Sequence, residues 1–461
     1  MKLTNLTGAI EIGANCYLLE AAGKRLLLDS GYHPKREGLE GLPRLEFIKD
    51  GTLDAILMSH AHQDHIGSLP VTMRRHPDAP VLMTEATRII GETMLHNSVN
   101  VMLAEKNERD TPGYPLFTHR ELDGGMRRWR SVPLNTRFDL AGERVSPAEQ
   151  APFSLEFFDA GHILGSVGTV IRAEGKTVFY SGDVQFDDQN ICRGATFPDF
   201  ADEPCDVMIM EGTRGDSPTP AGFTRASEQD RLAAAICRVF DRGGCVLIPL
   251  FALGKTQEFL AMVHLLRRAG KLPNCPIYIG GLGAKLTEAY DRLARKTPRQ
   301  VPDLDLMDDL APFVIGGANA HEIQVRPRRI FALSSGMMME KTLSNTVARK
   351  FFSQPENAIF FIGYADPESP AGKLRAAKTG DILSLAPQHA AEPIQCEVDS
   401  FTFSAHATRE TIVAYIKRVK PKKLILVHGD PAAVGWLAGT IRTEVPETEI
   451  IVPVPGSAFE L

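Results

Sequence analysis

Residues 53–65, LDAILMSHAHQDH, join a short apolar run to a group of metal-ligating side chains. The first seven residues are typical of a buried strand in a layered α/β protein. His60 and His62 stand two positions apart, so their side chains point the same way from an extended segment. Asp64 and His65 follow where the chain should turn, and they can face a second point nearby. Histidine nitrogen and carboxylate oxygen bind borderline and hard cations, so this stretch predicts a metal site.

The same arrangement recurs along the chain, where other strand-like runs end at histidines or carboxylates. Six of the 13 histidines occupy such positions, more than random placement in a core or on a surface would give. In sheets covered by helices, the carboxyl ends of the strands usually frame the site. The runs are RLLLD (25–29), FFDAG before His162, TVFYSGD (177–183), DVMIME (206–211), FTFSA before His406 and KLILVH (423–428), with helical patterns at 227–240, 256–270 and 408–418.

Composition restricts the class of protein. With 461 residues, the chain is long enough for two or three domains, or for one domain with a large insertion. Apolar residues make up 43% and charged residues 23%, which is typical of a globular protein and argues against disorder. We expect no membrane-spanning helix and no secretory signal at the N-terminus. The seven cysteines occur singly, without a CxxC pair, which predicts reduced thiols in the cytoplasm.

The charge is distributed unevenly although the formal net charge is only −6. Residues 212–395 hold 23 Lys and Arg against 18 Asp and Glu, and the rest of the chain holds 28 against 39. A basic central segment thus lies between acidic flanks. Ordinary surface variation and a phosphate-binding surface both explain this pattern.

HAHQDH matches the HxHxDH signature of the metallo-β-lactamase superfamily, and Asp29, His162 and Asp183 fall in the order of its other motifs. Further motifs resemble the β-CASP branch, which includes RNase J and the nuclease subunit of the cleavage and polyadenylation machinery. The resemblance extends from GANCYLLE, which begins at Gly13, to the last predicted strand. The further motifs are MEGTRGD (210–216), GGCVLIPLFALGKTQEFL (243–260), FALSSGMM (331–338), FIGYADPESPAGKL (361–374), FSAHATRE (403–410) and LVHGD (426–430).

This resemblance implies an α/β fold: an αββα metallo-β-lactamase sandwich interrupted by an inserted α/β β-CASP domain. We expect the first part of the sandwich at 1–211, the insert at 212–395 and the returning part at 396–461. Substrate in this family passes between the two domains, where a basic insert can neutralise a phosphate backbone. Because the chain ends at Leu461, soon after the last predicted strand, we expect a short form without a C-terminal extension. A homodimer would then have to use the core domains.

The resemblance also implies the site residues and their chemistry. Two cations about 3.5–4 Å apart would activate a bridging hydroxide for in-line attack on a phosphodiester. His-rich ligation favours two Zn²⁺ per chain, with Mn²⁺ as the alternative. One metal would be bound by His60, His62 and His162, the other by Asp64, His65 and His428, with Asp183 bridging both and Asp29 orienting the HxHxDH loop. The expected catalytic residues are Asp64, Asp183, Glu211 and His406, the last two as a proton-donating pair.

The implied activity is that of a hydrolase, a metal-dependent ribonuclease of RNA processing or decay. His428 favours RNA, because DNA-repair members carry a small apolar residue at that motif. Single-stranded RNA is the expected partner and DNA the alternative, with no membrane partner, and endonucleolytic and 5′-exonucleolytic cleavage both stay open. The candidate phosphate-contacting residues are Ser334, Ser335 and Gly336 in LSSGMM, together with Arg326, Arg328 and Arg329; a tight turn and a solvated loop are the alternative interpretations.

Two other classes of function stay open. A hydrolase of a small substrate, such as a lactam or thioester, needs neither the long insert nor the Glu211–His406 pair. A catalytically idle subunit of a larger complex typically loses metal ligands, whereas the full set is present here. The chain departs from the family pattern at Gly212, Arg214, Glu368, Ser369, Pro370 and Thr408, and no role is assigned to 105–130.

Overall fold

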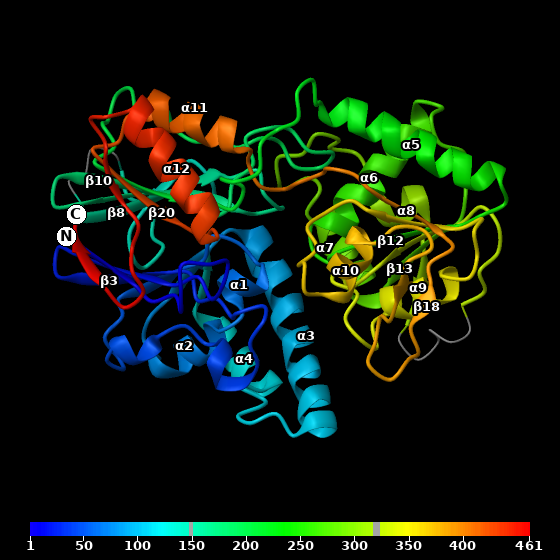
Figure 1. The fold of residues 1–461 in the computed structure, drawn as a ribbon. Helices are drawn as coiled ribbons and strands as arrows, with labels where there is room; N and C mark the ends of the chain where they lie inside the picture. The colour runs from blue at the N-terminus through cyan, green and yellow to red at the C-terminus, as the bar shows by residue number, and fades with distance from the viewer. Residues whose placement is uncertain (147–150, 317–322) are drawn as a thin grey trace. The chain divides into compact units, whose positions relative to one another are not determined.

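The computed structural model describes residues 1–146, 151–316 and 323–461 (Figure 1). These residues form two compact units. Unit 1 comprises 1–188, 192–219 and 405–461, and unit 2 comprises 189–191 and 220–404. The chain therefore enters unit 2 after residue 219 and returns to unit 1 at residue 405. Among the described residues, no helix has the length and apolar character needed to cross a membrane.

In the described residues, unit 1 contains two sheets of seven strands each. In spatial order, the first sheet consists of β22 (Ala458–Glu460), β1 (Lys2–Asn5), β2 (Tyr17–Ala21), β3 (Lys24–Leu28), β4 (Ala55–Leu57), β5 (Val81–Met83) and β6 (Trp129–Ser131). The second sheet consists of β21 (Glu449–Ile451), β20 (Lys423–Val427), β11 (Val207–Glu211), β10 (Lys176–Tyr180), β9 (Val167–Ala173), β8 (Phe153–Asp159) and β7 (Arg137–Phe138).

The two sheets pack face to face, and helices cover their outer faces. Strand β20 is continuously apolar because both of its faces are buried. Ile425 belongs to the core between the sheets, whereas Leu424 and Leu426 pack on the helix side. The helices of unit 1 are α1 (Gln63–Ile66), α2 (Leu69–Arg75), α3 (Glu85–Arg109), α4 (His119–Gly125), α11 (Arg409–Val419) and α12 (Pro431–Glu444). The predicted αββα sandwich is confirmed.

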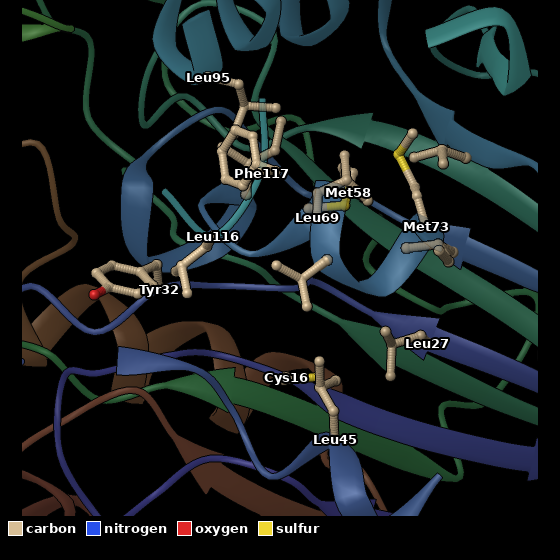
Figure 2. Close-up of a cluster of buried hydrophobic side chains, with 14 of the residues drawn as sticks. Cys16, Leu27, Tyr32, Leu45, Met58, Leu69, Met73, Leu95, Leu116 and Phe117 are labelled. Atoms are coloured by element: carbon tan, nitrogen blue, oxygen red, sulfur yellow. The ribbon is translucent and has the colours of Figure 1, made fainter. Parts of the chain in front are cut away.

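A separate apolar cluster joins the first sheet to its covering helices (Figure 2). Leu27 of β3 and Met58 lie in the same buried cluster as Met73 of α2 and Leu95 of α3. Helices α11 and α12 cover the second sheet in the same way, through Ile412, Ile416, Leu437 and Ile441.

Unit 2 is an α/β layer in which the described part of the chain forms a parallel six-stranded sheet. Its strands in spatial order are β14 (Phe313–Ile315), β13 (Ile277–Gly280), β15 (Ile330–Leu333), β12 (Val246–Pro249), β16 (Ala358–Phe361) and β19 (Glu397–Ser400). Strands β17 (Ile382–Leu383) and β18 (Glu392–Pro393) form a separate pair. The helices are α5 (Arg225–Asp241), α6 (Lys255–Arg268), α7 (Gly281–Arg292), α8 (Leu306–Leu310), α9 (Leu343–Phe351) and α10 (Pro370–Ala376).

The predicted strands and helices are present with small shifts at their ends, except for the run FTFSA. Strand β19 ends at Ser400 and pairs with β16 in the sheet of unit 2, and residues 401–408 form no strand. Phe401, Phe403 and Ala405 are buried at every second position, which imitates a strand in the sequence. The segment instead connects the two units, so the prediction of a strand before His406 is wrong.

Candidate metal centre

The HxHxDH loop begins where β4 ends. His62 has extended backbone (φ −69°, ψ 151°) and immediately precedes α1. His60 and His62 therefore leave an extended segment, whereas Asp64 and His65 lie in the first turn of a helix. This change of conformation within six residues lets one short motif contribute side chains to two neighbouring groups.

The first group consists of three histidines and one carboxylate. His62 Nδ1 lies 3.1 Å from His60 Nε2 and 3.0 Å from His162 Nε2. Asp183 Oδ2 lies 3.6 Å from His60 Nε2 and 3.5 Å from His162 Nε2. Burial lowers the pKa of His62 to about 4, and burial together with neighbouring histidines holds the pKa of His60 and of His162 well below the usual range. These rings are neutral at pH 7, as cation binding requires.

The second group shares Asp183 with the first. Asp64 Oδ2 lies 3.3 Å from His428 Nε2 and 4.0 Å from His65 Nε2. The other oxygen of Asp183, Oδ1, lies 3.3 Å from His65 Nε2 and 3.4 Å from His428 Nδ1. Asp183 therefore presents one carboxylate oxygen to each group.

Protonation differs between the two groups. Burial would raise the pKa of Asp64, but His65 and the hydrogen bond with His428 hold it at about 2. Burial opposes a charge on His65, yet the carboxylates of Asp183, Asp29 and Asp64 raise its pKa well above the usual value. The pKa of His428 is raised for the same reason, with Asp183 and Asp64 outweighing burial.

The donor set fits divalent cations. Asp183 Oδ1 is buried and, among the described residues, makes no hydrogen bond of standard geometry, although His65 Nε2 and His428 Nδ1 lie 3.3 and 3.4 Å away, so a cation held between these atoms would satisfy it. Three groups bring their ligand atoms within 4.8 Å of one another: His60, His62, His162 and Asp183; Asp64, His65 and His428; and Asp183, Glu211, His406 and His428. The mixture of imidazole nitrogen and carboxylate oxygen suits Zn²⁺ or Mn²⁺.

Asp29 holds the HxHxDH loop in position through hydrogen bonds and is not a member of either ligand group. It is fully buried after β3, and its carboxylate accepts hydrogen bonds from Ser59 N (2.7 Å), Ser59 Oγ (2.7 Å) and Tyr180 Oη (2.6 Å). His65 Nδ1 lies 2.7 Å from the same carboxylate. A carboxylate on Nδ1 fixes the orientation of the His65 ring and leaves Nε2 as its ligating atom.

Glu211 and His406 form a pair beside Asp183. Glu211 is fully buried at the end of β11, and Oε1 accepts a 2.7 Å hydrogen bond from Val184 N. His406 Nδ1 lies 3.1 Å from both Glu211 oxygens and 3.9 Å from Asp183 Oδ2. The pair is thus held by the backbone next to Asp183, with the His406 ring oriented by the glutamate.

Several side chains that support the site were not predicted from the sequence. Thr213 Oγ1 lies 2.8 Å from His428 Nδ1, and Asn15 Nδ2 lies 3.2 Å from His65 Nε2. Strands β11 and β20 pair in register, so the residues that follow Glu211 and Val427 meet. In the sequence, Thr213 and His428 each follow closely after a predicted strand. Only the pairing of β11 with β20 shows that these two residues meet.

Four of the positions that depart from the family pattern have local structural roles. Thr408 is the N-cap of α11, where its side chain accepts a hydrogen bond from Thr411 N. Ser369 caps α10 in the same way, with Pro370 as the first helical residue. Gly212 N donates to the backbone oxygen of Val427, next to His428. None of these positions contributes a ligand atom to the three groups of possible metal ligands.

The candidate phosphate-contacting residues lie in unit 2, and their role stays a prediction. Ser334, Ser335 and Gly336 follow β15, and the backbone oxygen of Ser335 accepts a 2.7 Å hydrogen bond from Ser344 Oγ. Arg328 Nε donates to the backbone oxygen of Phe240 at 3.3 Å, and an Arg329 terminal nitrogen donates to that of Gln324 at 3.2 Å. The Arg326 backbone oxygen accepts from Cys245 Sγ, and the Arg326 residue is exposed.

Cation loading is expected to occur in two steps that differ in proton release. Burial lowers the pKa of the first-group histidines, whereas neighbouring carboxylates outweigh burial and raise the pKa of His65 and of His428, so the second group keeps its protons to higher pH and releases them on ligation. Affinity at the second group should therefore rise with pH. Zinc titrations by calorimetry, in buffers of different ionisation enthalpy, should give a buffer-dependent enthalpy for the second step only. His428→Gln should remove that step, and equal proton release in both steps would contradict the prediction.

Three family models match successive parts of the chain. The model described as metallo-beta-lactamase superfamily matches residues 10–234, and the Beta-Casp domain model matches 256–374. The model described as Zn-dependent metallo-hydrolase RNA specificity domain matches 392–453. The first and third models cover the HxHxDH loop and the segment with His406 and His428, respectively.

Curated relatives match nearly the whole chain at low identity. Cleavage and polyadenylation specificity factor 73 of Drosophila melanogaster is 26% identical over 96% of this chain and 62% of its own length. Endoribonuclease YSH1 of Saccharomyces cerevisiae is 26% identical over 95% of this chain and 56% of its own length. Cleavage and polyadenylation specificity factor subunit 3-I of Arabidopsis thaliana is 26% identical over 100% and 64%. This chain therefore spans less than two thirds of each of these relatives.

A solved structure shares the fold. The crystal structure of a protein of unknown function from Enterococcus faecalis V583 matches with a TM-score of 0.61 and 14% sequence identity, and the match covers 100% of this chain and 99% of that one. That likeness shows the fold alone, and the three family models, which match successive parts of the chain in unbroken order, place the chain in the β-CASP family of the metallo-β-lactamase superfamily.

Proposed function

We propose that this chain is a metal-dependent ribonuclease that hydrolyses RNA phosphodiester bonds. The observation that carries the proposal is Asp183, a buried carboxylate with one oxygen toward each of two ligand groups and the Glu211–His406 pair beside it. The relatives named endoribonuclease or cleavage and polyadenylation specificity factor support RNA as the substrate. The match to an RNA specificity domain model supports it further.

The ligand groups support two cations, which we propose to be Zn²⁺, with Mn²⁺ as the alternative. His60, His62 and His162 would hold one cation and Asp64, His65 and His428 the other, with Asp183 between them. Cations bound there supply the Lewis acidity that activates a water for attack on phosphorus and balances charge on the phosphate. Asp29 keeps the HxHxDH loop in position for both groups.

His406, oriented by Glu211, would donate a proton to the leaving oxygen. The Nδ1 side of His406 faces the carboxylate of Glu211, so Nε2 is the atom that can deliver a proton to an alkoxide. Glu211 stabilises the protonated ring and fixes its direction. His406 is 23% exposed by its side chain, whereas Glu211 is buried, so the histidine is the member that substrate can reach.

We further propose that an insert near 212–395 contributes to RNA binding. The division of the described chain into two compact units supports the presence of an insert. Its Lys and Arg excess suits a phosphate backbone, with Ser334–Gly336 and Arg326, Arg328 and Arg329 as candidate contacts. None of the seven cysteines, all of which lie in the described residues, forms a disulfide, which supports work in a reducing compartment such as the cytoplasm.

A cleavage assay with two labelled RNAs tests this function. One RNA carries a linear 5′-monophosphate end and the other is a closed circle, each incubated with Zn²⁺ or Mn²⁺. We expect the circle to be cut, as the names of the relatives suggest, and the His62→Ala variant to lose cleavage of both. Shortening of the linear RNA alone, from its 5′ end, would show an exonuclease. If both RNAs stayed intact, or if matched DNA were cleaved instead, the ribonuclease proposal would be contradicted.

A further inference from the structure

A tight turn that follows β11 carries an arginine close to the Glu211–His406 pair. Gly215 N donates to the backbone oxygen of Gly212 at 3.0 Å, which closes the turn directly after the strand. Arg214 is the third residue of this turn and stands three positions after Glu211. The arginine and the acid of the pair therefore leave the same end of β11.

The two chain neighbours of Arg214 hold the turn in place. A Cβ on Gly215 would collide with the backbone oxygen of Ala433, so the turn packs tightly on α12. Thr213 Oγ1 lies 2.8 Å from His428 Nδ1, in the second ligand group. The backbone of Arg214 is thus fixed relative to the candidate metal centre without a contribution from its own side chain. All of these residues belong to unit 1.

The guanidinium of Arg214 has no partner in the described part of the chain. It donates no hydrogen bond and forms no ion pair there. Burial lowers the pKa of Arg214, and the carboxylates of Glu410 and Glu211, which act on its charge, offset this only in part. An unpaired, partly buried positive charge is costly unless an anion binds it.

The two neighbouring carboxylates are engaged elsewhere. Glu410 accepts hydrogen bonds from Thr219 Oγ1 at 2.8 Å and from Arg409 Nε at 3.2 Å. The hydrogen bonds of Glu211 are those that hold the proton-donating pair. Arg214 is also partly exposed, so a ligand from solvent can reach it.

The chemistry of the guanidinium selects a phosphate as that ligand. Its planar fork presents two parallel N–H donors, which match two oxygens of one phosphate group. An RNA strand that is cleaved beside His406 carries further phosphates on both sides of the scissile one. One of these phosphates would supply the anion that the described residues do not.

We propose that Arg214 binds a backbone phosphate of the RNA next to the scissile bond, through two parallel hydrogen bonds. The proposal rests on the proposed ribonuclease function and names one residue that holds its substrate. Arg214 is one of the positions at which the chain departs from the family pattern, so the resemblance implies no such contact. The candidate contacts Arg326, Arg328 and Arg329 lie in unit 2, whereas Arg214 lies in unit 1 with the metal centre.

Equilibrium binding of a short single-stranded RNA, measured by fluorescence anisotropy at several salt concentrations, tests the contact. The reference chain carries His62→Ala, so that the RNA stays intact. Arg214→Gln in this reference should weaken binding about 10–100-fold, the range for a hydrogen-bonded contact between charged groups. The slope of log affinity against log salt concentration should become shallower by about 0.7, the value for one phosphate contact on a single strand.

Two further variants separate geometry from charge. Arg214→Lys should keep the slope but lose part of the affinity, because an ammonium group cannot form the two parallel bonds. Arg418→Gln is the matched control: it removes an exposed arginine from the last turn of α11 and should change neither affinity nor slope. Equal affinity and slope for the reference and for Arg214→Gln would overturn the proposal, and so would a reference chain that binds no RNA.

Cleavage kinetics distinguish this contact from a structural role. Arg214→Gln alone should raise KM about 10–100-fold with kcat nearly unchanged, because the contact is made equally in the ground and transition states. Its melting temperature should not fall, since the guanidinium has no partner to lose. A fall in kcat at unchanged KM, or a lower melting temperature at unchanged salt slope, would contradict the contact. If the unchanged chain cleaved no RNA while Arg214→Gln still weakened binding, the ribonuclease proposal would fail and the contact would stand.

Discussion

RNA cleavage by an Asp183→Asn variant is expected to fall by about 10³-fold or more. The substitution keeps the size of the side chain but removes the negative charge that lies 3.3–3.6 Å from four histidine nitrogens. Lewis-acid assistance is worth several kcal/mol, and about 4 kcal/mol corresponds to roughly 10³-fold in rate. An amide also turns one cation-binding oxygen into an NH₂ group, which cannot ligate a cation. Single-turnover cleavage of labelled RNA measures the loss, and zinc content measures its cause.

Asp54→Asn is the matched control for this result. Asp54 precedes β4, at the opposite end of the strand from the HxHxDH loop, and its side chain is partly exposed beside Lys24. The same carboxylate-to-amide change there should leave cleavage and zinc content unchanged. If Asp183→Asn cleaved RNA within tenfold of the unchanged chain while binding less zinc, Asp183 would be a structural ligand and not a participant in catalysis.

Asp29→Asn is expected to lower the free energy of unfolding of the metal-free protein by about 3–5 kcal/mol, the range for breaking a buried charged pair. The carboxylate accepts hydrogen bonds from Ser59 N, Ser59 Oγ and Tyr180 Oη, and it faces His65 Nδ1. An asparagine must turn its NH₂ group toward at least one of these donors. It also removes a negative charge beside His65, whose pKa is raised by Asp183, Asp29 and Asp64 against the effect of burial.

Urea unfolding followed by circular dichroism measures this loss. Asp54→Asn again serves as the control, because its ion pair with Lys24 is solvent-exposed and such pairs contribute little to stability. Zinc should also bind the Asp29→Asn variant about 10–100-fold more weakly, since the loop would no longer hold the His65 ring. Unfolding at the same urea concentration as the unchanged protein would show that the hydrogen bonds to Asp29 contribute little.

Features that depend on neighbouring residues were predictable from the sequence. The run before His60 is apolar enough to be a buried strand. The four ligand-type residues that begin at its end lie within six positions: His60, His62, Asp64 and His65. KLILV (423–427) is continuously apolar because β20 is buried on both faces, a pattern that needs no knowledge of its neighbours. Such signals are local, so a layered α/β class and a metal site at 60–65 follow from the residues themselves, whereas the αββα sandwich and the full ligand set were implied by the resemblance to the metallo-β-lactamase superfamily.

Features that depend on which distant segments meet were decided only by the tertiary structure. FTFSA alternates like a strand, yet it connects the two units. The strand that pairs with β16 is β19, which ends just before this segment. Thr213 reaches His428 only because β11 and β20 end side by side. The division of Asp183 between two ligand groups likewise joins residues far apart in the chain. Local sequence restricts the conformation of each segment, but long-range packing determines which atoms come within 3–4 Å of one another.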